Sequence, residues 1–546
     1  MSRSDAAGPA WAWFALGAIA VGTSYALLPL YSSNQNHHFL IGLARAGDGW
    51  LRDDWMAHTV DPFPVFTTLV DAVHRRGADG LFYVIYYVLF GAYAFGLLGI
   101  VEHVVPGRPT AAQRLVWLAL LCVLHNEVFA YLIGFDPAHV AWWQMTHWGV
   151  AGQELFGHGA FQASSFGMLL PLAIRWFLER RPYAATALAG GVLLVHFSYV
   201  LIVAGLTAAF MGIELRRTRR VDSPLIVGGT ALACALPVLA YVALRLGPTS
   251  TDVSTTAAAI LVRHLPQETI PAQWFGVRTC VQIALMLGGV WVARRTDLLP
   301  ILAAPLAIGV VLTVGQVATG SPRLALLFPW RVSVLLVPIA TALLLQLAVR
   351  RAVTGDLARE RRWIRAAAVV VLLSMAAGLV RMTLHFAYFY GATSITSSID
   401  RFLPPRWRDD FARVLEYDAL PTMKYVRGTA RAGDLYVVPP DLERFRVVAG
   451  VPVLVDRKSH PYKDVEVLEW RRRLDLVEAM YASAAPCAEL QRIAELHPVT
   501  HVVVRAESPT SCAGWTRIRA DSAFKVYQRM RSPMLQLPPF DDTSER

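Results

Sequence analysis

Long apolar segments alternate with short basic connections over roughly the first 390 residues of the chain. A helix needs about 20 apolar residues to cross the hydrocarbon core of a bilayer, and most of these segments reach or approach that length. We therefore predict spanning helices over 10–31, 81–103, 114–134, 161–178, 183–196 with 198–213, 223–246, 277–294, 298–319, 328–349 and 366–388. Counting the fifth stretch as two passes gives about eleven spans.

The connections rich in arginine predict the orientation, because positive charge favours the cytoplasmic side of a membrane. They are 108–114, 175–181, 216–220, 294–295 and 350–365. For all of them to be cytoplasmic, the stretch from Tyr183 to Glu214 must turn back on itself near His196, as a hairpin does. The amino terminus is then inside and the tail outside.

Three long polar connections, 32–80, 135–160 and 247–276, then share the outer face with everything after Tyr390. We divide the chain into a membrane domain over 1–390 and a soluble domain over 391–546. A transporter built from two similar halves would show comparable loops in each half, and these loops are early and unequal.

The soluble tail has the pattern of an α/β domain. Apolar β-branched runs predict strands, and amphipathic runs of 3.6-residue period predict helices. The expected strands are 434–440, 451–458, 500–506 and 524–529, and the expected helices are 465–481 and 487–497. We predict the fold class as mainly α: a polytopic helical membrane domain followed by an extracytoplasmic α/β domain.

Composition supports the membrane assignment. The 546 residues are 55% hydrophobic and 17% charged, and the mean hydropathy is +0.42, which is too apolar for an ordinary soluble multidomain protein. The net charge of +11 comes from arginines at the ends of apolar segments, so it favours membrane lipids as partners and no nucleic acid. The first segment has no small-residue cleavage site, and we expect it to be retained as a span.

The five cysteines lack the spacing of a metal site. Cys487 and Cys512 both fall in the tail, where a disulfide is possible if the tail is extracytoplasmic.

The first outer loop carries the main candidate for chemistry. Residues 36–47 have apolar positions at helical spacing and predict an interfacial amphipathic helix, with Trp50 and Trp55 as anchors. Asp53 and Asp54 follow it, and paired carboxylates beside His37 and His38 can act as a general base or bind a divalent metal ion. Alternatively, the loop is solvated and its acids balance nearby arginines.

Further polar residues lie close to the predicted membrane boundary. Glu127 is placed within a span, and His147 and Glu154 follow in the second outer loop, where each suggests a polar cavity wall. Arg263 and His264 in the third loop, and Arg331 at a late span, could bind an anionic group such as phosphate or mark the interface.

The tail also holds a basic stretch. It contains Arg444, Arg446, Arg457, Lys458 and Lys463. These side chains form either a patch for anionic lipid or sugar phosphate or ordinary solvated positions of helices and strands.

The loop NQNHH…DDW, the stretch HWGVAGQELFGHGA and the tail pattern FR…VDRKSHP…EW resemble a group of bacterial integral membrane proteins related to the GT-C class of glycosyltransferases. The span count and the long outer loops also resemble that class. The resemblance implies a polyprenyl-phosphate sugar as donor, a glycan, lipid or protein as acceptor, and a location in the bacterial inner membrane. In that class an acid directly after the first span serves as base or metal ligand.

Here Asn34, Gln35 and Asn36 occupy the corresponding positions, and an amide cannot act as a base near neutral pH. The acidic role would pass to Asp53 or Asp54, whereas Asn34, Asn36, His37 and His38 would bind substrate. The competing hypotheses are a non-catalytic scaffold derived from that class and a lipid or polysaccharide transporter. We carry a possible divalent metal ion, held by Asp53 and Asp54, as the expected cofactor.

Overall fold

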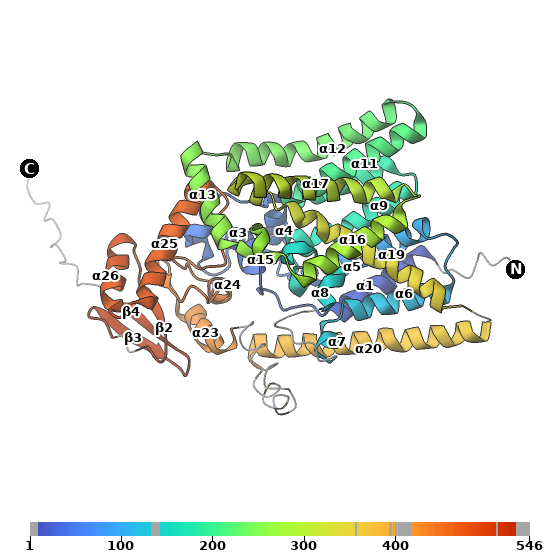
Figure 1. The fold of residues 1–546 in the computed structure, drawn as a ribbon. Coiled ribbons are helices and arrows are strands. Elements are labelled where there is room, and N and C mark those ends of the chain that lie inside the picture. Colours follow the sequence, from blue (N-terminus) through green and yellow to red (C-terminus); the bar gives the residue numbers. More distant parts are fainter. Residues whose placement is uncertain are drawn as a thin grey trace, which may run out of the picture.

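A computed structural model gives the fold, which is mainly helical (Figure 1). The structure describes residues 9–132, 142–354, 357–392, 396, 398, 401, 416–508 and 511–530. A bundle of long helices fills most of the molecule, and a smaller unit with a sheet lies at one end of it. We call this smaller unit, residues 416–530, the C-terminal unit. The N-terminal end of the described chain lies at the opposite end of the bundle (Figure 1).

Six helical segments within the described residues are long and apolar enough to cross a membrane. They are Gly80–Val104, Phe197–Thr218, Asp222–Leu246, Leu298–Thr319, Pro322–Ala352 and Ala358–Tyr390. They correspond to α5 (Gly80–Val104), α11 (Val200–Thr218), α12 (Asp222–Tyr241), α17 (Leu298–Thr319), α19 (Ser333–Ala352) and α20 (Leu357–Tyr390). The length and composition of these helices indicate a membrane protein.

Shorter apolar helices complete the bundle. They are α1 (Ala10–Tyr25), α6 (Ala111–Leu124), α9 (Leu170–Leu178), α10 (Pro182–Val195) and α16 (Val277–Ala293). The stretch 183–213 is two helices, α10 and α11, joined by a short turn at Phe197–Tyr199. Residues 133–134 of the third predicted span lie outside the described residues. Six segments of sufficient length do not by themselves establish the predicted eleven spans.

Small residues allow the first helices to approach closely. A methyl group added at Gly17 of α1 would lie 2.8 Å from the Ala94 side chain of α5, and one at Gly91 would meet Phe14. Close contact through small residues is a usual way for helices to associate in a bilayer, where lipid gives little hydrophobic driving force between them.

The connection between α1 and α5 is folded. It contains α2 (Gln35–His38), α3 (Leu40–Ala46), two 3₁₀ turns (Leu51–Asp53 and Trp55–His58) and α4 (Pro64–His74). The predicted amphipathic helix is thus observed in two pieces, and it ends at Gly47, whose φ of 85° lies in the left-handed region that glycine adopts without strain.

The two later connections are also helical. The first contains α7 (Glu127–Leu132), α8 (Trp142–His147) and 3₁₀ turns at Val150–Gly152, Gly157–Gly159 and Ala163–Leu169. The second continues α12 as Val242–Leu246 and contains α13 (Thr251–His264), α14 (Pro266–Thr269) and α15 (Pro271–Trp274), and α18 (Pro322–Ala325) with a turn at Pro329–Val332 precedes α19.

The C-terminal unit has a four-stranded sheet in the order β1-β2-β4-β3. Its strands are β1 (Tyr436–Val437), β2 (His501–Arg505), β3 (Trp515–Ala520) and β4 (Phe524–Arg529), and only β1 and β2 are parallel. Its helices are α23 (Leu420–Thr429), α24 (Phe445–Ala449), α25 (Asp464–Ala482) and α26 (Pro486–Leu496), after a turn at Tyr417–Ala419. The predicted strand 451–458 contributes only a single bridge at Val453, and β3 was not expected.

Candidate functional site

The first connection packs directly against the C-terminal unit. The amide of Trp50 donates a 2.8 Å hydrogen bond to the Gly450 carbonyl, and the Trp50 indole donates to the Ala430 carbonyl at 3.2 Å. Trp55 lies beneath the Arg473 guanidinium at 4.2 Å. Both tryptophans therefore contact the C-terminal unit, whereas the sequence had suggested anchoring at the membrane interface.

Asp54 lies at the centre of this contact. Its Oδ2 atom accepts hydrogen bonds from Arg446 Nε at 2.7 Å and from the Val453 amide at 2.9 Å, and its Oδ1 atom accepts from the Met56 amide at 2.7 Å. Arg446 also pairs with Asp456. The Asp54 side chain has no accessible surface, so this carboxylate joins the first connection to the C-terminal unit.

This bonding changes the expectation for the acidic pair. A general base or a metal ligand needs an oxygen that can face its target, and both Asp54 oxygens already accept hydrogen bonds within the protein. Asp53 is 41% exposed and lies 3.8 Å from Arg52. Among the described residues, no three His, Cys, Asp or Glu side chains are grouped so that they could hold a metal ion. The pair therefore does not fit the expected divalent metal.

Five histidines form a row beside this contact, and we call them the histidine row. In spatial order they are His196, His38, His37, His460 and His264. The distances between successive ring centroids are 6.3, 5.5, 5.4 and 5.3 Å. They come from the α10–α11 turn, α2, the C-terminal unit and the end of α13. Segments far apart in the sequence thus meet at one place.

Aromatic side chains enclose the histidine row. Phe63 stacks on His196 with ring centroids 4.6 Å apart and lies 4.8 Å from His38. Tyr462 lies 5.7 Å from His37, and Trp470 lies 4.8 Å from His264. Burial lowers the pKa of His37, His38 and His460 well below the ordinary histidine value. These imidazoles are therefore neutral at physiological pH.

Two cations face the neutral histidines. Arg331 lies within electrostatic range of His38, His196 and Tyr462, and Lys458 lies within range of His37, His38 and His460. Neither Arg331 nor Lys458 forms an ion pair with any residue that the structure describes. The buried Nε of Arg331 has no hydrogen-bond partner there either. Such an arrangement attracts an anion, because burying part of a guanidinium group without a carboxylate partner costs free energy that a bound anion would offset.

Several buried polar atoms near the row also have no hydrogen-bond partner among the described residues. They are both amide atoms of Asn36, His38 Nδ1 and the Ser459 hydroxyl. Asn36 and Ser459 are each 1% exposed. Because buried polar groups are nearly always satisfied in a folded protein, these atoms mark positions where a polar ligand would gain hydrogen bonds.

A second polar group lies in the turns between α8 and α9. The Glu154 carboxylate accepts from the Tyr25 hydroxyl at 2.9 Å and from the His158 amide, and it lies 3.3 Å from His158 Nε2. His158 is 52% exposed, whereas the Glu154 side chain is 6% exposed. The turn has positive φ at Gly157, His158 and Gly159. The flanking glycines make this backbone conformation accessible.

Burial raises the pKa of Glu154 to about 8, and the nearby Glu127 carboxylate contributes to the shift. A carboxyl group that titrates near neutral pH suits acid–base chemistry. Lys458 and Arg381 lie within electrostatic range of His158, so this Glu154–His158 pair and the histidine row share a neighbouring cation, Lys458.

The remaining predicted residues have varied surroundings. Glu127 forms an ion pair with Arg381 of α20. His147 is fully buried and stacks on His125 with ring centroids 4.5 Å apart. Asn34 begins α2, where its carbonyl accepts from the His38 amide at 2.9 Å. Arg263 is exposed and lies outside the row, although its neighbour His264 belongs to it.

Sequence reasoning did not select four residues of this region as site residues: His158, His196, Lys458 and His460. The first lies in a GHG turn, which is a usable signal for an exposed side chain on a glycine-supported turn. Lys458 belongs to the basic stretch of the tail, which the sequence analysis considered as a patch for anionic lipid or sugar phosphate. His196 and His460 have no local signal, because only tertiary contacts bring them to the row. The sequence analysis placed Arg446 in a basic patch or among solvated residues. In the structure Arg446 is 3% exposed and forms ion pairs with Asp54 and Asp456.

Part of the C-terminal unit matches a protein-family model. A family model described as a domain of unknown function (DUF6798) matches residues 417–477. No curated protein matches the chain. The matched segment includes Arg446 and Asp456 of the buried ion pair and Lys458 and His460 of the site, so it carries the face of the C-terminal unit that meets the first connection.

Proposed function

We propose that the protein transfers a sugar from a polyprenyl-phosphate donor to a glycan, lipid or protein acceptor on the outer face of the bacterial inner membrane. The observation that carries the proposal is the pair of cations, Arg331 and Lys458, beside the neutral histidine row. Arg331 lies in the turn Pro329–Val332 before α19, and this turn packs against α17, a membrane-length helix whose surface is mostly exposed. The prenyl chain of a phosphate bound there would therefore reach lipid along α17. A prenyl phosphate needs such cationic partners.

The roles follow from chemistry and exposure. Arg331 and Lys458 hold the phosphate, and Asn36 and His38 donate to sugar or phosphate oxygens. The Glu154–His158 pair takes the proton from the acceptor hydroxyl. The acceptor oxygen then bonds to the anomeric carbon, the bond from that carbon to the phosphate oxygen breaks, and the prenyl phosphate leaves as an anion.

The orientation is part of the proposal. The C-terminal unit contains a disulfide between Cys487 and Cys512, and disulfides persist mainly in oxidising compartments. This supports an extracytoplasmic C-terminal unit and a cytoplasmic amino terminus.

A non-catalytic scaffold is the second candidate. It is favoured by the amides at Asn34 and Asn36 in place of an acid and by the structural bonding of Asp54. A scaffold could keep the phosphate site and would need no base. A transporter has no comparable observation in its favour.

Binding is tested first, with polyprenyl phosphate as the probe and the uncharged polyprenol as the blank. The full chain is purified in a neutral detergent, and affinity is followed by thermal stabilisation. Arg331→Gln and Lys458→Gln should each weaken binding by about tenfold, since each loses a charge-assisted contact. Arg263→Gln, an exposed arginine outside the row, is the matched control and should bind normally. Equal affinity for polyprenol and polyprenyl phosphate would contradict the phosphate site.

Catalysis is tested in the native host through polyprenyl-linked sugars and surface glycans. Glu154→Gln should abolish transfer while leaving probe binding intact, and Asp53→Asn should leave transfer unchanged. Because the pair must be deprotonated to accept a proton, turnover of the unsubstituted protein should rise as the pH passes through about 8. A stable Glu154→Gln protein with an unchanged glycan profile would eliminate the transferase and leave the scaffold.

A further inference from the structure

A cleft rich in arginine lies at the other end of the helical bundle. Its cavity has a volume of about 640 Å³. Six basic side chains line it, and we call the group the arginine cleft: His103, Arg180, Arg216, Arg217, Arg294 and Arg295. They stand at the end of α5, after α9, at the end of α11 and between α16 and α17. The C-terminal unit is at the opposite end of the molecule (Figure 1).

The charge of the cleft is unbalanced. Asp297 is the one acid among its lining residues, against five arginines. Arg217 uses that acid, with Nη2 2.5 Å from Asp297 Oδ2, and it also pairs with Glu214 at 3.0 Å. Arg294 donates to the Trp291 carbonyl and stacks on the Trp291 ring.

The other three arginines are free to bind a ligand. Arg180, Arg216 and Arg295 are exposed, and none forms an ion pair with a residue in the described part of the chain. Each comes from a different connection, so the concentration of charge arises from the fold. Arginines that serve only to orient spans would need to be on one side of the membrane, but they would not need to converge on one cleft.

The rest of the lining is apolar. Val104, Leu299 and Pro300 belong to the same cleft, at the ends of the membrane-length helices α5 and α17, and Leu178 lies at the end of the shorter α9. A site with cationic and apolar walls suits an amphipathic anion better than a free ion. Basic pockets between the ends of spanning helices are a known way for proteins to hold anionic lipid head groups.

We propose that the arginine cleft binds the phosphate head group of an anionic phospholipid, with the guanidinium groups of Arg180, Arg216 and Arg295 as its ligands. Each guanidinium presents a planar fork of N–H donors that matches phosphate oxygens. Arg217 and Arg294, which are held by Asp297 and Trp291, shape the wall of the cleft. The apolar residues contact the first part of the acyl chains. This inference does not depend on the transferase proposal, because it concerns the other end of the molecule.

The experiment uses the full chain in a neutral detergent, with phosphatidylglycerol and phosphatidylcholine as separate probes. Native mass spectrometry counts bound lipid, and thermal stabilisation gives the affinity. Phosphatidylglycerol should bind at least tenfold more tightly than phosphatidylcholine, and Arg216→Gln with Arg295→Gln should reduce that affinity by roughly tenfold or more. If this double variant does not fold, Arg180→Gln, at an exposed turn, replaces it and should reduce the affinity severalfold.

The matched control is Arg361→Gln with Arg362→Gln. These arginines are exposed near the start of α20, and this part of α20 lies at the same end of the bundle as the cleft (Figure 1). They are not among the residues that line the cleft. The control should bind phosphatidylglycerol normally. Equal losses in both double variants, or equal affinity for the two lipids, would overturn the proposal.

A third arm separates a lipid from a soluble anion. Inorganic phosphate alone, at millimolar concentration, should neither stabilise the protein nor displace phosphatidylglycerol. If it does both, the cleft binds a free phosphate compound and the lipid assignment fails.

Discussion

Two adjacent acids of the first connection have different surroundings. The Asp53 side chain is 41% exposed, whereas Asp54 has no accessible surface and three donors. Sequence alone treats them as a pair, because both follow the same amphipathic helix. Asp54 differs from Asp53 because it caps the turn Trp55–His58 through the Met56 amide and packs against Arg446 and Val453 of the C-terminal unit. At the scale of the residue, burial therefore decides whether a carboxylate can react or must serve the fold.

Replacing each acid separately should show this difference. Asp54→Asn should lower the free energy of unfolding by about 3 kcal/mol, because the buried Arg446 guanidinium then keeps one carboxylate partner, Asp456, in place of two. Asp53→Asn is the matched control and should change it by less than about 1 kcal/mol, as expected for an exposed pair. Thermal unfolding in detergent measures both. Equal stability of the two variants would show that the buried pair is not needed for the fold.

At the scale of elements, the C-terminal unit matches the expected helices better than the expected strands. The predicted helices 465–481 and 487–497 correspond closely to α25 and α26. The predicted strand 451–458 pairs with β1 only around Tyr436, whose amide donates to the Pro452 carbonyl and whose carbonyl accepts from the Leu454 amide. Pro452 has no N–H to extend this pairing. Edge strand β3 is mostly exposed, so it lacks the apolar alternation that would have revealed it.

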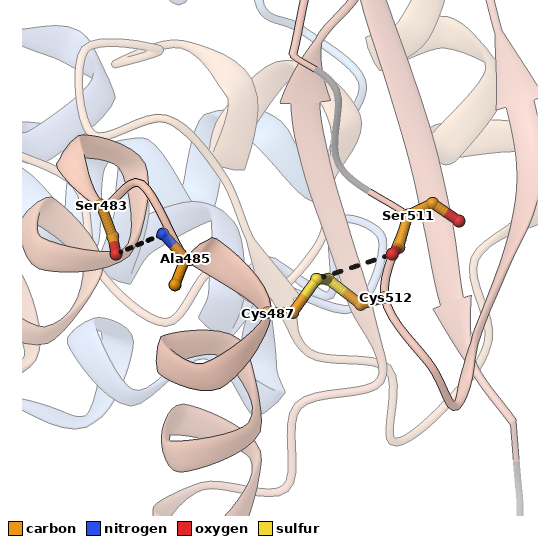
Figure 2. The surroundings of a disulfide bond; sticks show 5 residues. All are labelled: Ser483, Ala485, Cys487, Ser511 and Cys512. Atoms are coloured by element: carbon orange, nitrogen blue, oxygen red, sulfur yellow. Dashed lines mark hydrogen bonds between the residues drawn. A yellow bond between two sulfur atoms is a disulfide. The ribbon is translucent and has the colours of Figure 1, made fainter.

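A disulfide joins two elements of this unit. Cys487 at the start of α26 bonds Cys512, which precedes β3, and the bond closes a separation of 25 residues (Figure 2). The possible pairing inferred from the sequence is thus observed.

Removing this cross-link should destabilise the C-terminal unit. We expect Cys487→Ser with Cys512→Ser to lower its free energy of unfolding by about 3 kcal/mol, from the loop-closure entropy that the cross-link removes from the unfolded chain. Cys280→Ser, at an exposed free cysteine, is the control and should have little effect. Unfolding under non-reducing conditions measures both. If the double variant were as stable as the control, the disulfide would have no stabilising role.

At the scale of the whole molecule, the two ends of the bundle differ in chemistry. One end carries the C-terminal unit with the histidine row, and the other carries the arginine cleft. This asymmetry agrees with the orientation proposed from the basic connections, in which arginine marks the cytoplasmic side.

The orientation can be tested by labelling introduced cysteines with a membrane-impermeant maleimide in intact spheroplasts. In a Cys280→Ser background, Glu495→Cys on the exposed face of α26 should be labelled. Arg220→Cys, in the connection between α11 and α12, should be labelled only after the membrane is permeabilised. The reverse pattern would invert the orientation and place the histidine row inside the cell.

The sequence by itself determined the class of the molecule and much of its local structure. Apolar length predicted the long helices, and amphipathic spacing predicted α2 with α3, α25 and α26, because these features depend on the period of nearby residues. It also selected His37, His38, His264, Glu154 and Arg331. A polar residue close to an apolar segment costs free energy in a membrane, so such a residue is a candidate for binding or chemistry.

Tertiary structure alone decided which of these residues act together. It buried Asp54 beneath Arg446 and excluded Arg263 from the row. It also added His196 and His460 and placed Lys458 of the basic stretch beside the row, although His196 is far from the other two in the sequence. It also brought arginines from separate connections into one cleft. No local pattern encodes these outcomes, because burial and the nearest charged neighbour depend on contacts between distant segments.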